Sequence, residues 1–486
     1  VPVLGALEAA GVLVRGEIRP GGAELDWCDA EVLRRLKRRN LARLRDEVAA
    51  VDTATLAGFL PRWHGIGERR QGAERLREVI AQLQGLALPW SLWRDVVLPA
   101  RVQGFRLEML DMLAANGAVV WVGRGASGAR DGRVALYLRE QVRDLLLPED
   151  DYEPPGELHR AILDVLAGQG ASFLIEIETE VASRELVFEP REFRDALWDL
   201  VWAGQITNDT FGPLRELARG ASRRRRRGAG PAGALGVAGG GRSAEVVAGG
   251  RWALVSGLAP GGVNPTKQAV ARTRLLLDRY GIVSRQCLAG EDMPGGFGPI
   301  YKVLRELEEQ GRVRRGYFVE GLAGAQFAYA GAVDRLRAGR AEAEERDHTV
   351  TADDIQVLSA MDPANPWGSQ VPWPEVQDPA QGKPRRVASA WVLLARGRPV
   401  LYVAGRGRSV TTFPETIRDE DGALEAAIEA LRGLPRAALK GALTIEKIDG
   451  RPAQQSALAE AFRRAGFESD YRGLMDARTP DFGVSA

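Results

Sequence analysis

The chain has only two cysteines, Cys28 and Cys287, among its 486 residues. Two cysteines this far apart exclude a disulfide scaffold and the paired CxxC spacing of a zinc knuckle, and they favour the reducing cytoplasm as the compartment. The three histidines, His64, His159 and His348, are too dispersed in the sequence to indicate a metal site. No motif in the chain predicts a cofactor.

Long apolar runs and nucleotide-binding motifs are also missing. No run of about eighteen apolar residues occurs, so the sequence predicts no membrane-spanning helix. The Walker pattern GxxxxGK[ST] is absent, as are HExxH and GxSxG, which argues against nucleotide hydrolysis and against serine or zinc chemistry. The first residues, VPVLGALEAAG, lack the features of a signal peptide and an initiating Met. We therefore expect this chain to be an excised piece of a larger protein.

The overall charge is nearly balanced, with 66 Lys and Arg against 65 Asp and Glu. A nucleic-acid site therefore has to come from local segregation of charge and not from overall basicity. The length predicts about three or four domains.

Residues 295–330 combine a short helix, a tight turn and a basic hairpin. Apolar residues fall at helical spacing in the first part, and alternation follows in RVRRGYFVEG before a second extended run, QFAY. This pattern predicts a winged helix. Its exposed hairpin would carry Arg312, Arg314 and Arg315, and its helix Lys302, where a phosphate backbone could lie. A solvated basic hairpin on an ordinary core is the alternative.

The order helix, helix, hairpin recurs and predicts tandem winged helices. The first unit spans 71–148, the second spans 155–218, and the third, with the basic wing, spans 251–338. Residues 219–250 are rich in Gly, Ala and Arg and have no apolar period, so we expect a disordered linker there. The alternative is a generic α+β chain without a true repeat.

The two ends of the chain differ from these units. Residues 1–70 contain a basic helix at 31–48, and we interpret the region as an incomplete or divergent winged helix that could face DNA or protein. Beyond residue 354, VASAWVLLARG, RPVLYVAGRG and RSVTTF resemble consecutive strands. We predict a β-barrel-like domain with flanking helices over 354–486. The predicted fold class is α+β, with tandem winged helices followed by this domain.

Carboxylates are the candidates for catalysis. GASFLIEIETEV would place Glu176, Glu178 and Glu180 on one face of an extended run. Three like charges on one face are energetically costly unless they are solvated, paired with arginines or used in catalysis. Asp476, followed by Asp481, is the second candidate. A carboxylate beside a sugar C1′ would stabilise an oxocarbenium-like transition state and activate a water. A solvated strand face and a frayed tail are the respective alternatives.

Aromatic residues are unevenly placed. Trp367 and Trp373 stand in MDPANPWGSQVPWP, a proline-stiffened loop that could present ring faces to unstacked bases. Packing against the C-terminal domain is the alternative for both. Trp198 and Trp202 are four residues apart on a predicted helix, and we expect them in the core.

Five long strings occur along the chain: WCDAEVLRRLKRRNLARLR (27–45), LVWAGQITNDTFGPLREL (200–217), RRGYFVEGLAGAQFA (314–328), DPANPWGSQVPWP (362–374) and AGFESDYRGL (465–474). Together they resemble the large helicase-related protein family of bacteria, Lhr, in the portion downstream of the ATP-driven helicase core. The resemblance covers nearly the whole chain.

This resemblance implies tandem winged helices followed by a β-barrel, an arrangement similar to the AlkZ and YcaQ class of DNA glycosylases. It implies a DNA-repair role with uracil excision, self-association, and a helicase core in the same polypeptide. It also implies a catalytic aspartate near the C-terminus, where Asp476 matches by position and is preferred to Asp481. AlkZ-like enzymes use a short Q-Φ-Q or Q-Φ-D element, and the nearest pattern identified is Glu176-Ile177-Glu178, with acids in place of amides.

We interpret the chain as the C-terminal module of an Lhr-type DNA-repair helicase that binds single-stranded or duplex DNA and excises uracil from a flipped base. Asp476 would be the catalytic carboxylate, and Glu176 and Glu178 the competing pair. The alternative is a non-catalytic module that binds DNA, oligomerises, or tethers the helicase core.

Overall fold

The computed structural model describes residues 2–16, 25–36, 49–128, 131–146, 152–218, 249–260, 264–345, 349–378, 383–435, 439 and 442–476. The chain divides into two compact units, of which the smaller holds 1–52 with 317–320 and the larger holds 53–316 with 321–486. Within the described residues, no helix combines the length and the apolar composition needed to span a membrane.

The smaller unit is built on a two-stranded sheet. Helix α1 (Pro2–Ala9) precedes strand β1 (Leu13–Gly16), which pairs antiparallel with β2 (Asp26–Asp29). A helix then begins at Ala30, and the described part of the predicted basic helix ends at residue 36. Most of that prediction therefore lies outside the described residues.

The described residues of the first winged-helix domain (53–138) contain five helical segments and a three-stranded antiparallel sheet of order β3-β5-β4. On α4, Leu76, Val79, Ile80 and Leu83 are completely buried, because spacings of three and four residues bring them to one helix face. The elements are α3 (Thr53–Trp63), α4 (Gly72–Leu83), β3 (Leu88–Pro89), α5 (Trp90–Leu92), η1 (Trp93–Val97), α6 (Leu107–Ala115), β4 (Val119–Ala126) and β5 (Gly132–Leu138). The short helix α7 (Val142–Leu145) follows.

Residues 157–254 hold the second of the units predicted as winged helices, which we call the second winged-helix domain, and its sheet extends beyond the predicted end at residue 218. Strand β8 (Arg251–Leu254) pairs antiparallel with both β6 (Ser172–Phe173) and β7 (Ile206–Asn208), so it completes this domain's sheet from beyond the predicted linker. A long connection inside a hairpin adds little closure entropy, because that cost grows only slowly with loop length. The predicted linker itself lies almost entirely outside the described residues. The helices of this domain include α8 (Glu157–Gln169), α9 (Leu174–Ala182) and α10 (Pro190–Trp202), and residues 212–218 are also helical.

The third winged-helix domain (265–328) has a sheet of order β10-β11-β9. Its first helix, α12, begins after Asn264, whose side chain accepts the backbone N–H groups of Thr266 and Lys267. The elements are α12 (Pro265–Tyr280), β9 (Ile282–Val283), η3 (Arg285–Leu288), α13 (Phe297–Glu309), β10 (Arg314–Gly316) and β11 (Gln326–Ala328), followed by α14 (Ala330–Glu345).

The C-terminal domain (352–476) has two sheets. The larger has the order β12-β13-β14-β15-β17-β18, and the smaller has the order β16-β20-β19. The strands are β12 (Ile355–Ser359), β13 (Trp391–Ala395), β14 (Arg398–Ala404), β15 (Ser409–Thr412), β16 (Thr444–Ile445), β17 (Lys447–Ile448), β18 (Arg451–Pro452), β19 (Phe467–Asp470) and β20 (Gly473–Asp476). Between them lie η4 (Ala352–Asp354), α15 (Pro414–Asp419), α16 (Ala423–Ala430), η6 (Leu431–Gly433), η8 (Ala453–Gln455) and α17 (Ala459–Arg464).

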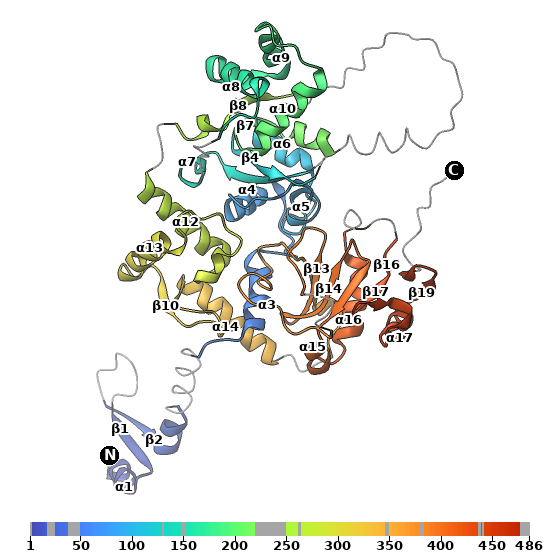
Figure 1. Cartoon of the computed structure of the whole chain (residues 1–486). Coiled ribbons are helices and arrows are strands. Elements are labelled where there is room, and N and C mark those ends of the chain that lie inside the picture. Colours follow the sequence, from blue (N-terminus) through green and yellow to red (C-terminus); the bar gives the residue numbers. More distant parts are fainter. Residues whose placement is uncertain are drawn as a thin grey trace. The chain divides into compact units, whose positions relative to one another are not determined.

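The predicted barrel is not confirmed. Among the described residues, the larger sheet begins at β12 and ends at β18, and no pairing joins these two strands. Strands β15 and β17 are parallel, and a parallel pair requires a crossover, which here contains α15 and α16. Helix α16 packs against β13 and β14 (Figure 1). Helix α16 therefore covers one face of the sheet. The apolar side chains on that face are buried without the sheet closing into a barrel.

Gly397, in the turn between β13 and β14, packs directly against α3. Its φ is +84°, and a Cβ there would lie 1.9 Å from the carbonyl oxygen of Ala54. We expect Gly397→Ala to lower the free energy of unfolding by about 2–4 kcal/mol, because left-handed backbone strain adds to a clash with rigid backbone. Gly405→Ala is the matched control, since its φ is +62° but its nearest neighbour would be 3.8 Å away. Equal losses in urea titrations of both variants would contradict the packing argument.

Candidate functional site

The predicted basic wing is exposed. Arg312, Arg314 and Arg315 lie at the surface around β10, and Lys302 lies at the surface of α13. The Arg314 guanidinium reaches Asp334 of α14 only at 4.0 Å, and the two side chains are 56% and 66% exposed, so solvent screens this pair. The third winged-helix domain therefore presents positive charge from a helix and from a hairpin strand.

The acid-rich run 174–182 is a helix, so the predicted extended run is wrong. Leu174, Ile177 and Val181 are its buried residues, and spacings of three and four place them on one helix face. The Glu176 carboxylate accepts the backbone N–H of Phe173 at 2.8 Å, which satisfies a free donor at the start of α9. Glu176 is exposed and Glu178 is half-buried.

Asp476 is the last residue of β20 and is only 1% exposed. Its Oδ1 is 3.1 Å from Nε of Arg432, which also pairs with Glu429 and donates to the carbonyl of Ala465. This arrangement supports the strand pairing at the C-terminal edge. The structure places Asp476 and the α9 glutamates in different domains, and Asp481 lies outside the described residues.

The two loop tryptophans pack within the protein. Trp367 is 6% exposed, and its indole N–H donates to the carbonyl of Gly397 at 3.0 Å. Trp373 is half-buried, and its ring centroid lies 5.7 Å from that of Tyr402 and 6.1 Å from that of Phe413. Both rings thus pack within the C-terminal domain in this conformation, and base stacking by either residue stays a prediction.

A cavity of about 820 Å³ lies where the first and third winged-helix domains meet the loop 361–370 of the C-terminal domain. Three arginines lining it, Arg124, Arg133 and Arg272, come from β4, β5 and α12. Its volume is within the range of small-molecule sites, roughly 300–1,000 Å³. Other lining residues include Gln84, Trp202, Tyr280, Cys287, Glu291, Asp292 and Gln370.

Trp202 reaches the cavity from the second winged-helix domain. Its ring stacks on Trp198 with centroids 5.1 Å apart, and a Cβ on Gly132 would lie 2.3 Å from it. The absence of a side chain at Gly132 thus allows the ring to lie flat against the wing of the first winged-helix domain. The sequence predicted Trp202 in the core. In the structure its side chain is only half-buried.

The loop 361–370 is held by two arginines, of which Arg101 is buried and Arg386 is half-buried. Arg101 forms a bidentate pair with Asp362, with distances of 2.6 and 2.9 Å, and both side chains are almost completely buried. Arg386 donates to the backbone carbonyls of Met361, Asp362, Asn365 and Trp367. Fixed guanidinium donors of this kind give the cavity wall a defined shape.

Glu291 is engaged within the protein. Its Oε1 accepts the hydroxyl of Tyr280 at 2.7 Å and pairs with the buried Arg279, which also donates to the carbonyls of Gln82 and Gln84. Burial, followed by the Glu291 charge, raises the pKa of Tyr280 well above its usual value. Both groups therefore serve the packing of α12 against α4.

Cys287 is buried beside this cluster. Burial raises the pKa of its thiol to about 12, so it is protonated at neutral pH and is a poor nucleophile. Its Sγ lies 3.4 Å from the carbonyl oxygen of Ile282 and 3.4 Å from Oε1 of Gln370.

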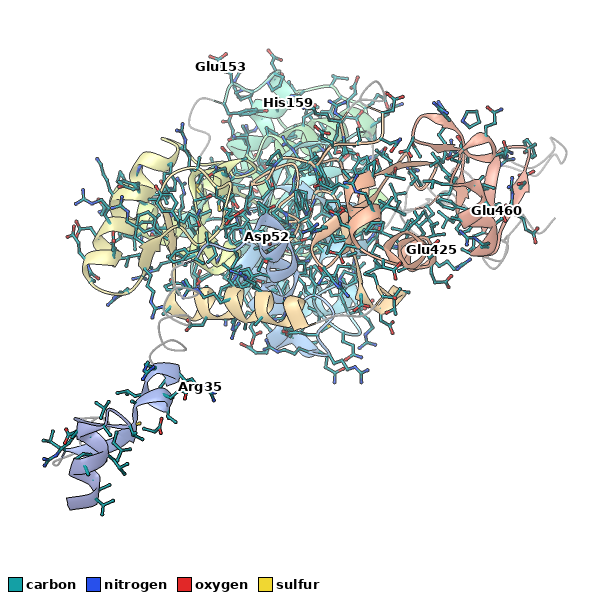
Figure 2. All side chains as sticks on the ribbon, turned by 90° about the horizontal axis from the view of Figure 1, so that it is seen from below. Arg35, Asp52, Glu153, His159, Glu425 and Glu460 are labelled. Atoms are coloured by element: carbon teal, nitrogen blue, oxygen red, sulfur yellow. The ribbon has the colours of Figure 1, made fainter. Side chains whose placement is uncertain are left out.

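The histidines do not form a metal site among the described residues. His159 lies on the second winged-helix domain, with its Nε2 3.4 Å from the carboxylate of Asp199 (Figure 2). His64 is completely buried beside Arg101, and His348 lies outside the described residues.

Burial of His64 makes the stability of the larger unit depend on pH. Burial, together with the Arg101 charge, lowers the pKa of His64 well below 6.5. The unfolded chain therefore binds a proton below about pH 6.5 that the folded chain does not bind, and stability falls by up to about 1.4 kcal/mol per pH unit.

We expect His64→Gln to flatten the fall in unfolding free energy between pH 7 and pH 5. Urea titrations at pH 7, 6 and 5 measure this fall. His159→Gln, at the contact with Asp199 on the second winged-helix domain, is the control. Parallel pH profiles for the wild type and His64→Gln would show that this group is not responsible.

The sequence argument missed the cavity residues. One local signal was available, because Gln82-Leu83-Gln84 places two amide side chains around a buried apolar residue at the end of α4. Gln84 is 2% exposed and lines the cavity, while the amide of Gln82 donates to backbone carbonyls of Trp63 and Asp278. No comparable signal marks Arg272 or Gln370.

Comparison with known proteins identifies two of the domains. Residues 51–139 and 262–348 each match a winged-helix domain of the large helicase-related protein, the third and the fourth respectively. The chain carries two Lhr winged-helix domains. These matches include the first winged-helix domain and the third, which bears the basic wing.

Two long relatives align with almost the whole chain. One, named Lhr helicase/probable uracil glycosylase, is from Mycolicibacterium smegmatis and is 36% identical in an alignment of 489 residues that covers 97% of this chain. The other, named Lhr helicase/uracil glycosylase, is from Escherichia coli and is 37% identical in an alignment of 479 residues that covers 92% of this chain. The chain spans only 31% and 30% of their respective lengths.

Among solved structures, the DNA glycosylase AlkZ of Streptomyces sahachiroi is similar to this chain with a TM-score of 0.42 and 13% sequence identity. The similarity covers 80% of this chain and 97% of AlkZ.

Proposed function

We propose that this Lhr segment binds DNA through its winged helices and excises uracil. The observation that carries the proposal is the exposed positive charge of Arg312, Arg314, Arg315 and Lys302 on a domain that matches an Lhr winged helix. Charge of this kind on a hairpin and a helix contacts phosphates and supplies most of the affinity for nucleic acid. The names of both relatives support uracil as the excised base.

Excision would proceed on a base that has been flipped out of the strand or is already unpaired. The bond from the sugar to the base breaks through an oxocarbenium-like state, a carboxylate stabilises the positive charge, and a water adds at C1′. Asp476, Glu176 and Glu178 are the proposed carboxylates. Of these, the half-buried Glu178 has no hydrogen bond or ion pair within the described residues, whereas Asp476 would have to leave Arg432.

Alkali-induced scission tests this activity. The chain is incubated with end-labelled single-stranded DNA that contains one uracil, and alkali then cleaves any abasic site. We expect the wild type to give scission at the uracil. The variant that removes the catalytic carboxylate should lower the rate of excision at least about 100-fold, because electrostatic stabilisation and general-base catalysis have effects of this size. The variants are Asp476→Asn, Glu176→Gln and Glu178→Gln, and Glu425→Gln, on the surface of α16 (Figure 2), is the control.

The second candidate function is a non-catalytic DNA-binding module that tethers a helicase core in the same polypeptide. Its support is that Asp476 and Glu176 already have structural partners, Arg432 and the backbone of Phe173. An intact uracil strand after incubation with the wild type would favour this function. Self-association and a cytoplasmic location stay predictions.

A further inference from the structure

Tyr317 is an exposed aromatic residue in the wing of the third winged-helix domain. It follows β10 directly, two residues after Arg315, and its side chain is 70% exposed. Among the described residues, no aromatic ring stacks on it and no guanidinium group lies over it. The ring is therefore accessible to a flat ligand from solvent.

The backbone beside Tyr317 is anchored, although its side chain is not. Phe318 is 9% exposed and Val319 is 1% exposed. The backbone N–H of Val51 donates to the carbonyl of Phe318 at 2.8 Å, and the backbone N–H of Glu320 donates to the carbonyl of Val51 at 2.8 Å. These contacts hold the turn in one conformation without covering the Tyr317 ring. A ring presented in this way loses little conformational freedom when it binds.

Positive charge precedes this ring in the same hairpin. Arg314 and Arg315 are exposed, and Tyr317 follows them with only Gly316 between. Two carboxylates are near in the sequence or in space: the exposed Glu320, and Asp334, which lies 4.0 Å from Arg314 in a pair that solvent screens. Guanidinium groups contact phosphates, and an aromatic ring stacks on any base because every base has a π-face. The hairpin thus carries both of the groups that an unpaired strand offers a match for.

We propose that Tyr317 stacks on an unpaired base of a DNA strand whose phosphates contact Arg314 and Arg315. The wing then prefers single-stranded DNA to a fully paired duplex, because stacking between neighbouring base pairs covers the faces of the bases. The proposal rests on the proposed function, since it takes DNA as the ligand of the wing, and it specifies unpaired DNA as the form that the wing selects.

Affinities for two forms of DNA test this role. The wild type, Tyr317→Ala and Tyr317→Phe are titrated by fluorescence anisotropy with a labelled single strand that lacks uracil, and with the duplex of the same sequence, at several salt concentrations. We expect Tyr317→Ala to bind the single strand about tenfold more weakly, which is the size of effect that loss of one base–aromatic stack produces. Its salt slope and its affinity for the duplex should not change, because no charge is removed. Tyr317→Phe keeps the ring and should bind like the wild type.

Tyr471→Ala is the matched control. Tyr471 is 79% exposed in the turn between β19 and β20 of the C-terminal domain, so its removal deletes the same surface group elsewhere. This variant should bind both forms of DNA like the wild type, and both alanine variants should keep the wild-type melting temperature. Photo-cross-linking of the wild type to a single strand that contains 5-iodouracil is a measurement that needs no variant. The cross-linked peptide should be the one that contains Tyr317.

Unchanged affinity of Tyr317→Ala for the single strand would overturn the proposal. An equal loss for single strand and duplex, or a loss that also occurs in Tyr317→Phe, would overturn it too. If binding in that case still depends on Arg314 and Arg315 and uracil DNA is still cut, the proposed function stands without the ring. If the wild type cuts no uracil DNA but prefers the single strand through Tyr317, uracil excision fails and the stacking site stands.

Discussion

Asp362→Ala should lower the free energy of unfolding of the larger unit by about 3–5 kcal/mol, because it leaves the completely buried guanidinium of Arg101 without its partner. The Asp362 carboxylate also accepts the backbone N–H of Ala364 at 2.8 Å, so the start of the loop loses an anchor as well. Glu460→Ala is the control, since its pair with Arg463 is exposed and is expected to cost less than about 1 kcal/mol (Figure 2).

Removing both partners should be milder than removing one. Arg101→Met combined with Asp362→Leu leaves no unpaired charge in the interior, and we expect it to recover most of the loss. Chemical unfolding followed by tryptophan fluorescence measures all four proteins. A double variant as unstable as Asp362→Ala would mean that loop packing and not the unpaired charge sets the cost.

The same pair adds a dependence on acid. Burial alone would raise the pKa of Asp362, but the charge and hydrogen bonds of Arg101 outweigh it, so the pKa lies below its usual value. A carboxyl group whose pKa is lowered by folding stabilises the fold above its unfolded pKa of about 3.9, and that contribution disappears as the pH falls through the folded value. Asp362→Ala should therefore lose less stability than the wild type between pH 4 and pH 3.

Reversing the charge of the wing should have the largest effect on DNA. We expect Arg314→Glu combined with Arg315→Glu to lower the affinity for a single-stranded oligonucleotide at least about tenfold at low salt, because two phosphate contacts are lost and two repulsions replace them. The slope of log affinity against log salt should become shallower by about 1.4. Each phosphate contact to a single strand contributes roughly 0.7 to this slope, and two contacts are lost.

The control for the wing keeps the change in net charge the same. Arg418→Glu combined with Arg463→Glu alters two exposed arginines of the C-terminal domain. Fluorescence anisotropy over a range of salt concentrations should give this variant nearly the affinity and slope of the wild type. Equal losses for the two double variants would show that net charge and not the wing governs binding.

Helices with a clear apolar period could be predicted from the sequence. Residues 107–115 have an apolar period typical of a helix, and α6 has these bounds. Its buried residues, Leu110, Leu113 and Ala114, include spacings of three and four positions, and this local pattern is what the sequence shows directly. The strands β13, β14 and β15 could be predicted for a similar reason, because glycines mark the ends of the apolar runs.

The predictions of secondary structure and of domain bounds failed where packing against other segments of the chain decides the structure. The alternation in 174–182 suggested a strand, but Leu174, Ile177 and Val181 were also three and four residues apart, and packing selected the helix. Strand β8 looked like the start of a new domain because its partners, β6 and β7, lie on the other side of residues 219–250.

By itself, the sequence determined the α+β class, the repeated winged helices, the basic wing and the resemblance to Lhr, because periodicity, turns and long distinctive strings are local. Only the tertiary structure decided that no pairing among the described residues closes the sheet of the C-terminal domain, that Asp476 is buried against Arg432, and that Arg272 and Gln370 line one cavity. Those features depend on contacts between separate segments, which are 44 positions apart for Arg432 and Asp476 and 98 positions apart for Arg272 and Gln370. Burial and pairing at such contacts follow from three-dimensional packing, which no local pattern in the chain encodes.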